Sequence, residues 1–153
     1  MDAWTKFAES IFRLNGLLMQ AGESITAPVG QSSARWQVLG RLYYRAQTVA
    51  ELARDIGHAR QSVQRLADAL VKEGLLMASA KPDDRRTFLL EVTPEGLAVL
   101  NALYLRQLEW SRRVVSQFSD EQLQAVAATL QGIGDVVQAD AARNTDGEPS
   151  SPS

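Results

Sequence analysis

The segment from Thr48 to Gly96 restricts the possible folds of this chain most strongly, because it carries two helix signals followed by a hairpin signal. The run Thr48-Val-Ala-Glu51 has the spacing of a capping box, in which the threonine and glutamate side chains bind the first free N–H groups of a helix. A helix should therefore begin at Val49. It should end at Gly57, because glycine readily adopts the left-handed conformation that stops a helix.

A second helix, predicted from Arg60 to Glu73, is amphipathic. Its apolar residues recur at three- and four-residue steps, which predicts one buried stripe of Val63, Leu66, Ala67, Leu70 and Val71. The opposite side carries groups suited to base edges and phosphates, namely Arg60, Gln61, Ser62, Gln64, Arg65 and Asp68. A plain solvated helix face is the alternative for these residues.

Two short strands, 75–79 and 87–92, are predicted next, around the polar loop 81–86. Arg85 and Arg86 would lie at the tip of this hairpin. They could be solvated turn residues only, but a basic hairpin after two such helices favours contact with phosphates or a groove. The whole pattern is that of a winged helix-turn-helix. The expected fold is therefore mainly α with a small β-hairpin wing.

The net charge of −2 is unevenly distributed, and the centre of the chain is basic. Between Arg35 and Arg86, ten lysines and arginines stand against six aspartates and glutamates, whereas the remaining residues hold six against twelve. A basic centre in an acidic chain is typical of a DNA-binding protein, although solvated charge clusters are also common. The 153 residues, 45% of them apolar, suit one domain with its own core.

Several other classes of function have no support in the sequence. The absence of cysteine excludes disulfides, thiol nucleophiles, thiol redox sensing and cysteine-bound zinc. His58 is the only histidine, and no carboxylates pair with it at a metal-ligand spacing. No phosphate-binding glycine loop, nucleophile elbow or paired carboxylates indicate catalysis. We therefore expect no enzyme, no metal and no cofactor.

Helices are also predicted on the N-terminal side of the central segment. One should run from Asp2 to about Gln20, and its apolar stripe is wide enough to suggest a partner helix from a second copy. Residues 21–31 should form a loop, because they include Gly22, Pro28 and Gly30. Another helix should start near Ser32 or Ser33. Its expected inner residues are Trp36, Leu39, Leu42 and Tyr43, and its expected outer residues are Arg35, Arg41 and Arg45.

Beyond the hairpin, Thr93 should cap a long helix that begins at Pro94 and ends near Gln117. The run Ser119-Asp-Glu-Gln122 is a second capping box, which predicts a last helix. Residues 143–153 contain no apolar side chain after Arg143 and are expected to form a disordered tail. Because there is no signal segment and no apolar run of about 20 residues, we expect a cytoplasmic protein without a membrane partner.

With these elements in place, the chain resembles the MarR family of bacterial transcription regulators. The resemblance rests on the order of the helices, on the run Q-S-V-Q-R-L-A-D-A-L-V-K-E-G-L-L and on the wing. The wing is the most specific part, because Asp84, Arg86, Val92 and Thr93 fill the positions of the family's aspartate, arginine, aliphatic residue and threonine. The similar region extends from about Trp4 to Val137.

The resemblance implies an obligate homodimer of winged helices. It implies one regulator domain over 1–142, with a DNA-binding core at about 32–96 and dimerisation helices at about 2–20 and 94–140. The function expected from it is a sequence-specific, double-stranded DNA-binding transcriptional regulator, in particular a repressor. A winged-helix module that contacts proteins without specific DNA binding is the alternative.

The resemblance also implies roles for individual residues. The helix from Arg60 would enter the major groove of a pseudo-palindromic operator, and Arg86 would reach the minor groove with Asp84 helping to hold it. The expected DNA contacts are Arg60, Gln61, Ser62, Gln64, Arg65, Asp84, Arg85 and Arg86.

In the family, small aromatic or amphipathic ligands that relieve repression bind where the dimerisation helices meet the winged helix. Aromatic and apolar residues with nearby arginines suit such a site. The candidates are Phe7, Ile11, Met19, Trp36, Arg41, Tyr43, Tyr44 and Arg45. Ordinary core packing is the commoner explanation for Trp36, Tyr43 and Tyr44.

Overall fold

A computed structural model describes residues 1–145, and these divide into two compact units, Met1–Trp110 and a second that begins at Ser111. The sequence predicts a single domain over 1–142. The buried core lies entirely in the first unit, where its side chains come from the region between Val38 and Leu90. Described residues of the second unit include no buried side chain.

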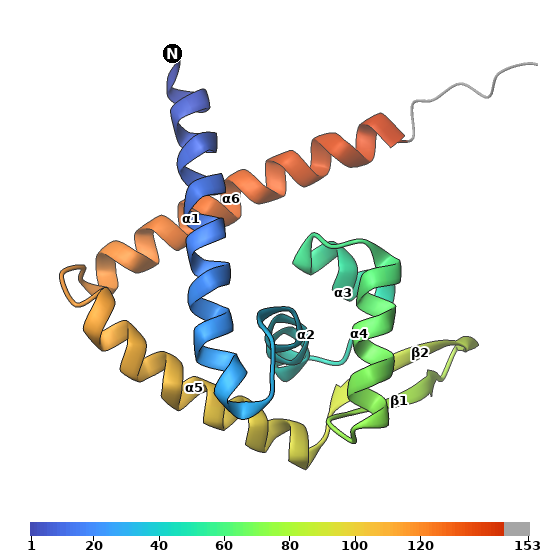
Figure 1. The fold of residues 1–153 in the computed structure, drawn as a ribbon. Coiled ribbons are helices and arrows are strands. Elements are labelled where there is room, and N and C mark those ends of the chain that lie inside the picture. Colours follow the sequence, from blue (N-terminus) through green and yellow to red (C-terminus); the bar gives the residue numbers. More distant parts are fainter. Residues whose placement is uncertain (146–153) are drawn as a thin grey trace, which may run out of the picture. The chain divides into compact units, whose positions relative to one another are not determined.

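Helix α1 (Ala3–Thr26) is longer than predicted (Figure 1). Asp2 caps it as expected, with its carboxylate accepting the Thr5 N–H at 2.8 Å. The helix continues through Gly22, so the prediction of a loop over 21–31 was wrong for its first six residues. Gly22 is needed for close packing, because a Cβ at this position would lie 2.2 Å from the Ser33 hydroxyl. The chain turns only at the short 3₁₀ helix η1 (Ala27–Val29).

Helix α2 (Ser33–Tyr44) starts where the sequence predicts, with Ser32 as its cap. Leu39 and Leu42 are buried as expected, and Val38 joins them. Tyr43 was placed on the inner face, and this was wrong, because its side chain is 62% exposed. Residues one position after a buried leucine lie about 100° further around the helix and can face solvent.

Helices α3 (Val49–Ile56) and α4 (Arg60–Lys72) form the predicted pair. Both halves of the capping box at Thr48 are present, and Gly57 is left-handed with φ 75°. The buried side of α4 consists of Val63, Ala67 and Leu70, which pack with α2 and α3 in the core. Leu66 is half-buried, but Val71 is 37% exposed, so its prediction as part of the buried stripe was wrong. Burial of this stripe fixes which side of α4 faces outward.

The hairpin consists of β1 (Leu76–Lys81) and β2 (Asp84–Val92), paired antiparallel from Leu76↔Val92 to Lys81↔Asp84. It extends beyond α3 and α4 in Figure 1. The strands are longer than predicted, so the arginines of the expected loop lie on β2. Gln47 forms a bridge to Leu90 on the other edge of β2, which ties the hairpin to the start of the helix pair.

Helix α5 (Pro94–Val114) follows the wing, and the Thr93 hydroxyl caps it by accepting the Gly96 N–H at 3.1 Å. In the second unit, Ser119 and Gln122 form the predicted capping box at the start of α6 (Asp120–Thr145). This helix includes the first three residues of the expected tail 143–153, and the others lie outside the described residues. Among residues 1–145, no helix is long and apolar enough to cross a membrane.

Candidate nucleic-acid interface

The outer face of α4 presents all five polar residues that the sequence assigns to DNA. Because Val63, Ala67 and Leu70 are turned into the core, the intervening residues point away from it. The exposed residues of the first turn and a half of α4 are Arg60, Gln61, Ser62, Gln64 and Arg65. This arrangement leaves two guanidinium groups and three hydrogen-bonding side chains on one free surface.

Two features near the start of α4 bear on how it could bind a nucleic acid. Ala59 precedes the helix and supplies no side-chain cap, so the first N–H groups are not occupied by a capping oxygen. Free N–H groups at a helix N-terminus attract anions such as phosphate. One turn later, the Gln64 amide donates to the Asp68 carboxylate at 2.8 Å, which orients the Gln64 side chain along the helix.

The wing presents Arg85 and Arg86 as exposed side chains on β2. Asp84 organises the backbone beside them, because one carboxylate oxygen accepts the Arg86 N–H at 3.0 Å and the other accepts the Thr87 hydroxyl at 2.6 Å. These bonds, that from Thr87 first, lower the pKa of the Asp84 carboxyl below its ordinary value. Asp84 thus binds the backbone of Arg86, and no ion pair joins the two side chains in the described part of the chain.

A groove of about 500 Å³ separates α3 and α4 from the wing. It brings together residues from both predicted DNA-binding elements, Arg60 and Gln64 from the helix and Arg86 from the strand. Phe88 also lines it and is 53% exposed, but it was not among the predicted contacts. The signal that could have identified Phe88 is its position two residues after Arg86, because side chains alternate along a strand.

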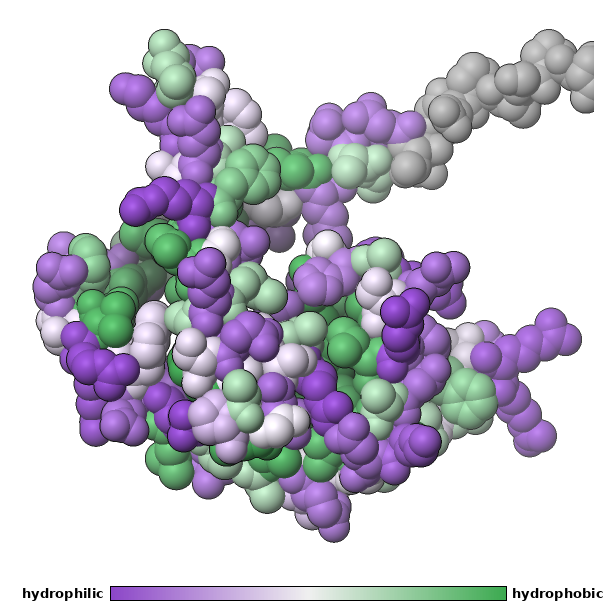
Figure 2. Space-filling view, in the orientation of Figure 1, coloured by the Kyte–Doolittle hydropathy of each residue, from purple (hydrophilic) through white to green (hydrophobic). Residues whose placement is uncertain are grey.

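The charges at this surface are free to act on a ligand. Within residues 1–145, no carboxylate lies within ion-pair distance of Arg60, Arg65, Arg85 or Arg86, whereas Arg35 and Arg45 are paired. Figure 2 shows hydrophilic side chains over the end of the hairpin. A surface with several unpaired guanidinium groups attracts a polyanion and retains its donors for phosphates and base edges.

A second hollow, of about 510 Å³, lies beside α2 and contains three of the eight ligand candidates, Trp36, Arg41 and Tyr44. Its other lining residues were not among the predicted ligand candidates; they are Gln37, Gly40, Ile56 and Gln107. Gln37 is notable because its Oε1 is buried without a hydrogen-bond partner among the described residues, while its Nε2 contacts the Met19 sulfur at 3.6 Å. An unpaired buried acceptor is costly unless a ligand or water satisfies it.

The remaining ligand candidates lie elsewhere. Tyr43 packs edge-on against Tyr44 but does not line the hollow. Arg45 pairs with Glu51 at 3.7 Å and Asp55 at 3.5 Å on α3. Phe7 and Ile11 on α1 are half-buried and are not part of the lining, and Met19 reaches it only through its contact with Gln37. The residues 1–145 also contain no cluster of three metal-ligating side chains.

Comparison with known proteins extends these observations. The sequence profile of the MarR family matches residues 30–87. An uncharacterized protein of Mycobacterium tuberculosis (strain ATCC 25618 / H37Rv) is 37% identical over 129 residues, which cover 84% of this chain and 90% of the relative. The residues matched by the family profile therefore include α3, α4 and most of the hairpin.

Two solved structures share the fold. A MarR-family transcriptional regulator from Rhodococcus sp. RHA1 has a TM-score of 0.77 and 20% identity, over 88% of this chain and 96% of that one. CouR from Rhodococcus jostii RHA1, solved with bound p-coumaroyl-CoA, has a TM-score of 0.74 and 23% identity, over 84% of this chain and 91% of that one. At these identities the similarity establishes the architecture.

Proposed function

We propose that this chain, which belongs to the MarR family of winged-helix transcription regulators, is a homodimer that binds a specific double-stranded DNA sequence. The bound dimer would repress transcription until a small aromatic or amphipathic ligand binds to it. The observation that carries this proposal is the groove between α4 and the wing. It combines the exposed hydrogen-bonding face of a helix with the unpaired Arg86 on a neighbouring strand. A helix of this size fits the major groove of B-DNA, which is about 12 Å wide.

The two parts of this surface would divide the recognition. Gln64 and Arg65, near the start of α4, have the side-chain types that pair with adenine and guanine edges. Arg85 and Arg86 on the wing lie where they can contact the phosphates or the adjacent minor groove. Helix contacts would thus set the sequence preference, and wing contacts would supply mainly affinity.

Exposed apolar side chains on the terminal helices support dimerisation. On α1, Phe12 is 76% exposed, and Trp4, Leu14, Leu17 and Leu18 are exposed with it. On α6, the large apolar side chains Leu123, Val126, Val136 and Val137 are exposed, and Figure 2 shows hydrophobic groups on the visible face of this helix. Apolar surface of this extent is typical of an interface. A two-fold dimer would present two recognition helices to a pseudo-palindromic site, with half-sites about one helical turn apart.

The test is selection of bound duplexes from a random pool, followed by fluorescence polarisation on the recovered sequence. Arg65→Gln should relax preference at particular base pairs, with a loss of about 1–3 kcal/mol on the selected duplex. Arg86→Gln should weaken binding to all duplexes and reduce the slope of log K against log salt by about 1. Arg143→Gln, on α6, is the matched control. Recovery of no preferred sequence would favour a protein-interaction module instead.

The hollow beside α2 supports the proposed ligand control. Trp36 and Tyr44 offer aromatic contact, Arg41 can pair with a carboxylate, and Gln37 offers an unsatisfied acceptor to a ligand donor. CouR, which shares the fold, was solved with an aromatic thioester bound. Hydroxylated aromatic acids, which carry a donor, an acid and an apolar ring, are therefore the class to test first.

Ligand control is tested by titrating 4-hydroxybenzoate and 4-hydroxycinnamate while tryptophan fluorescence and DNA affinity are followed in one sample. Binding near Trp36 should change the fluorescence, and a true effector should also lower DNA affinity. Fluorescence change without loss of affinity would deny the ligand a regulatory role, because a ligand shifts an equilibrium only through unequal affinity for the two states.

A further inference from the structure

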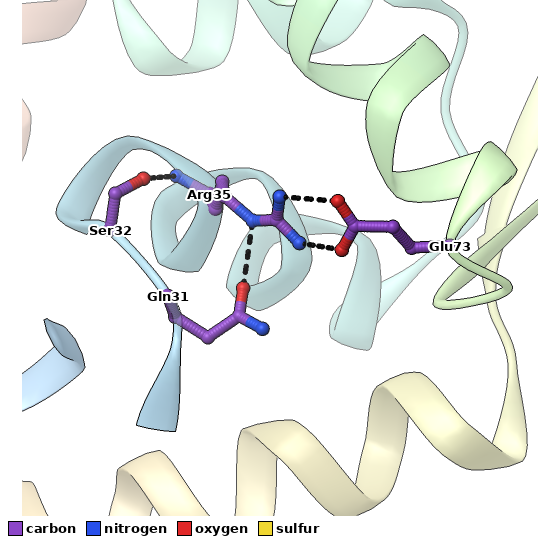
Figure 3. Close-up of polar contacts among 4 residues, drawn as sticks. All are labelled: Gln31, Ser32, Arg35 and Glu73. Carbon is purple, nitrogen blue, oxygen red and sulfur yellow. Dashed lines mark hydrogen bonds and ion pairs between the residues drawn. The ribbon is translucent and has the colours of Figure 1, made fainter. Parts of the chain in front are cut away.

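The C-terminal end of α4 is held by an ion pair that the proposed DNA contacts do not include. Arg35, in the first turn of α2, donates from Nη1 to Glu73 Oε1 at 2.9 Å and from Nη2 to Glu73 Oε2 (Figure 3). Its Nε donates to Gln31 Oε1 at 2.8 Å, and its backbone N–H donates to the Ser32 cap at 3.2 Å. All three guanidinium nitrogens therefore have partners.

This arrangement differs from an ordinary surface ion pair in its geometry and in the burial of one partner. The Arg35 side chain is 17% exposed, whereas the Glu73 side chain is 48% exposed. Two parallel N–H···O bonds fix direction as well as distance, and Glu73 sits at the residue that ends α4. The hydrogen bonds from Arg35 also lower the pKa of the Glu73 carboxyl below its ordinary value, because they favour its ionised form.

The same turn of α2 is attached to α1 through Ser33, two residues before Arg35. The Ser33 N–H donates to the Glu23 carboxylate at 2.9 Å, and its hydroxyl donates to the Met19 carbonyl at 3.3 Å. Gly22 allows the close approach of the two helices at this point. The first turn of α2 thus contacts α1 on one side and the end of α4 on the other.

We propose that Arg35 is a positioning residue for DNA recognition, which acts by clamping Glu73 and so fixes the orientation of α4 relative to α1 and α2. This inference rests on the proposed DNA-binding function. The apolar core holds α4 in contact with its neighbours, but apolar packing is non-directional. A helix rises 1.5 Å per residue, so Gln64 lies about 13 Å from Glu73, and a tilt of roughly 10° at the clamp would move it by about 2 Å. A hydrogen bond to a base edge does not tolerate that displacement.

The experiment compares two variants that change the net charge in opposite directions. Affinity is measured by polarisation for the best duplex from the random pool and for a scrambled duplex of equal length. If Arg35 acted only through its charge, Arg35→Gln would weaken and Glu73→Gln would strengthen binding to both duplexes. Positioning predicts that both variants lower the ratio of selected to scrambled affinity, by about five- to tenfold.

Controls separate positioning from general stability. Arg143→Gln removes another ion-paired arginine, on α6, and should leave the ratio unchanged. The exchanged pair Arg35→Glu with Glu73→Arg should restore part of the ratio lost in either single charge reversal. Urea unfolding should show a folded population above 95% for each variant used. An unchanged ratio in either glutamine variant would overturn the proposal.

Failure of the proposed DNA binding remains distinguishable from failure of the clamp. If the wild-type protein prefers no duplex, hydrogen exchange still tests whether the ion pair of Arg35 and Glu73 holds the end of α4. Arg35→Gln should then speed exchange in the last turn of α4 and at the start of β1 relative to Arg143→Gln, because local opening there is no longer opposed by the ion pair. Equal exchange rates in the two variants would refute the clamp.

Discussion

Replacement of Gly22 by alanine tests the packing at which α1 and α2 meet. An alanine Cβ built at this position lies 2.2 Å from the Ser33 hydroxyl oxygen and 3.3 Å from the Ser33 Cβ. The hydroxyl would have to rotate away, which would break its bond to the Met19 carbonyl. Ser33 is 4% exposed, so the displaced oxygen would remain buried.

The free energy of unfolding should fall despite the better helix propensity of alanine. Overpacking costs about 1–3 kcal/mol, and loss of one hydrogen bond costs about 0.5–1.5 kcal/mol. Replacing a helical glycine by alanine contributes about 1 kcal/mol in the opposite direction. The expected net loss is therefore about 0.5–3.5 kcal/mol, and Ser33→Ala in the same chain should recover part of it by removing the oxygen.

The assay is urea unfolding followed by circular dichroism at a fixed protomer concentration, because the stability of a dimer depends on concentration. Gly40→Ala, on α2, is the control, since a Cβ there meets nothing within 4 Å, and it should stabilise the protein by about 0.5–1 kcal/mol. Equal stabilisation by Gly22→Ala and Gly40→Ala would refute the inference that Gly22 serves close packing.

Three further predictions concern assembly, the ligand and pH. Phe12→Arg combined with Val126→Arg places charge on the exposed apolar faces of α1 and α6. Sedimentation should show loss of the dimer, since a buried unpaired charge costs several kcal/mol. A dimer of unchanged stability would mean that the interface lies elsewhere. Arg41→Gln should weaken the binding of aromatic carboxylates at least about tenfold, as measured by tryptophan fluorescence. Arg45→Gln should not weaken it, because Arg45 pairs with α3 away from the hollow. Equal losses of affinity in both variants would contradict this placement of the ligand. The pKa of Glu73 is lowered in the folded chain from 4.5, so its contribution to stability is present above pH 4.5 and is lost as pH falls through the lowered pKa. In a plot of the free energy of unfolding against pH, Glu73→Gln should therefore make the decline on the acid side shallower. Identical plots for the two proteins would argue against the ion pair of Arg35 and Glu73.

The local signals of the helices were sufficient to predict most of this fold. Capping boxes at Thr48 and Ser119, the left-handed Gly57 and the apolar stripe of α4 all depend on residues within one or two turns of each other, and a sequence shows such spacings directly. The exposed polar face of α4 followed from the same periodicity, because burial of one stripe determines the opposite one.

Features that depend on distant residues were predicted poorly. Gly22 was interpreted as a helix breaker, although it lies in a helix that needs a small residue against Ser33. Arg35 was assigned to an outer face because its partner, Glu73, is 38 residues away. Residues such as Gln37 and Gln107 meet around the hollow from different helices. None of these relations has a period that a single sequence could reveal.

Helix α2 connects the proposed ligand site and the proposed DNA site, and this sets a condition on ligand control. Trp36 and Arg41 of this helix line the hollow, and its first turn holds the end of α4 through Arg35. Contact with α2 alone would not regulate DNA binding, because the ligand must bind more tightly to the arrangement that DNA disfavours. Coupling is reciprocal, so an effector that lowers DNA affinity by a given factor must itself be bound more weakly, by the same factor, when the operator is present. A ligand whose affinity is equal with and without the selected duplex would occupy the hollow without controlling α4.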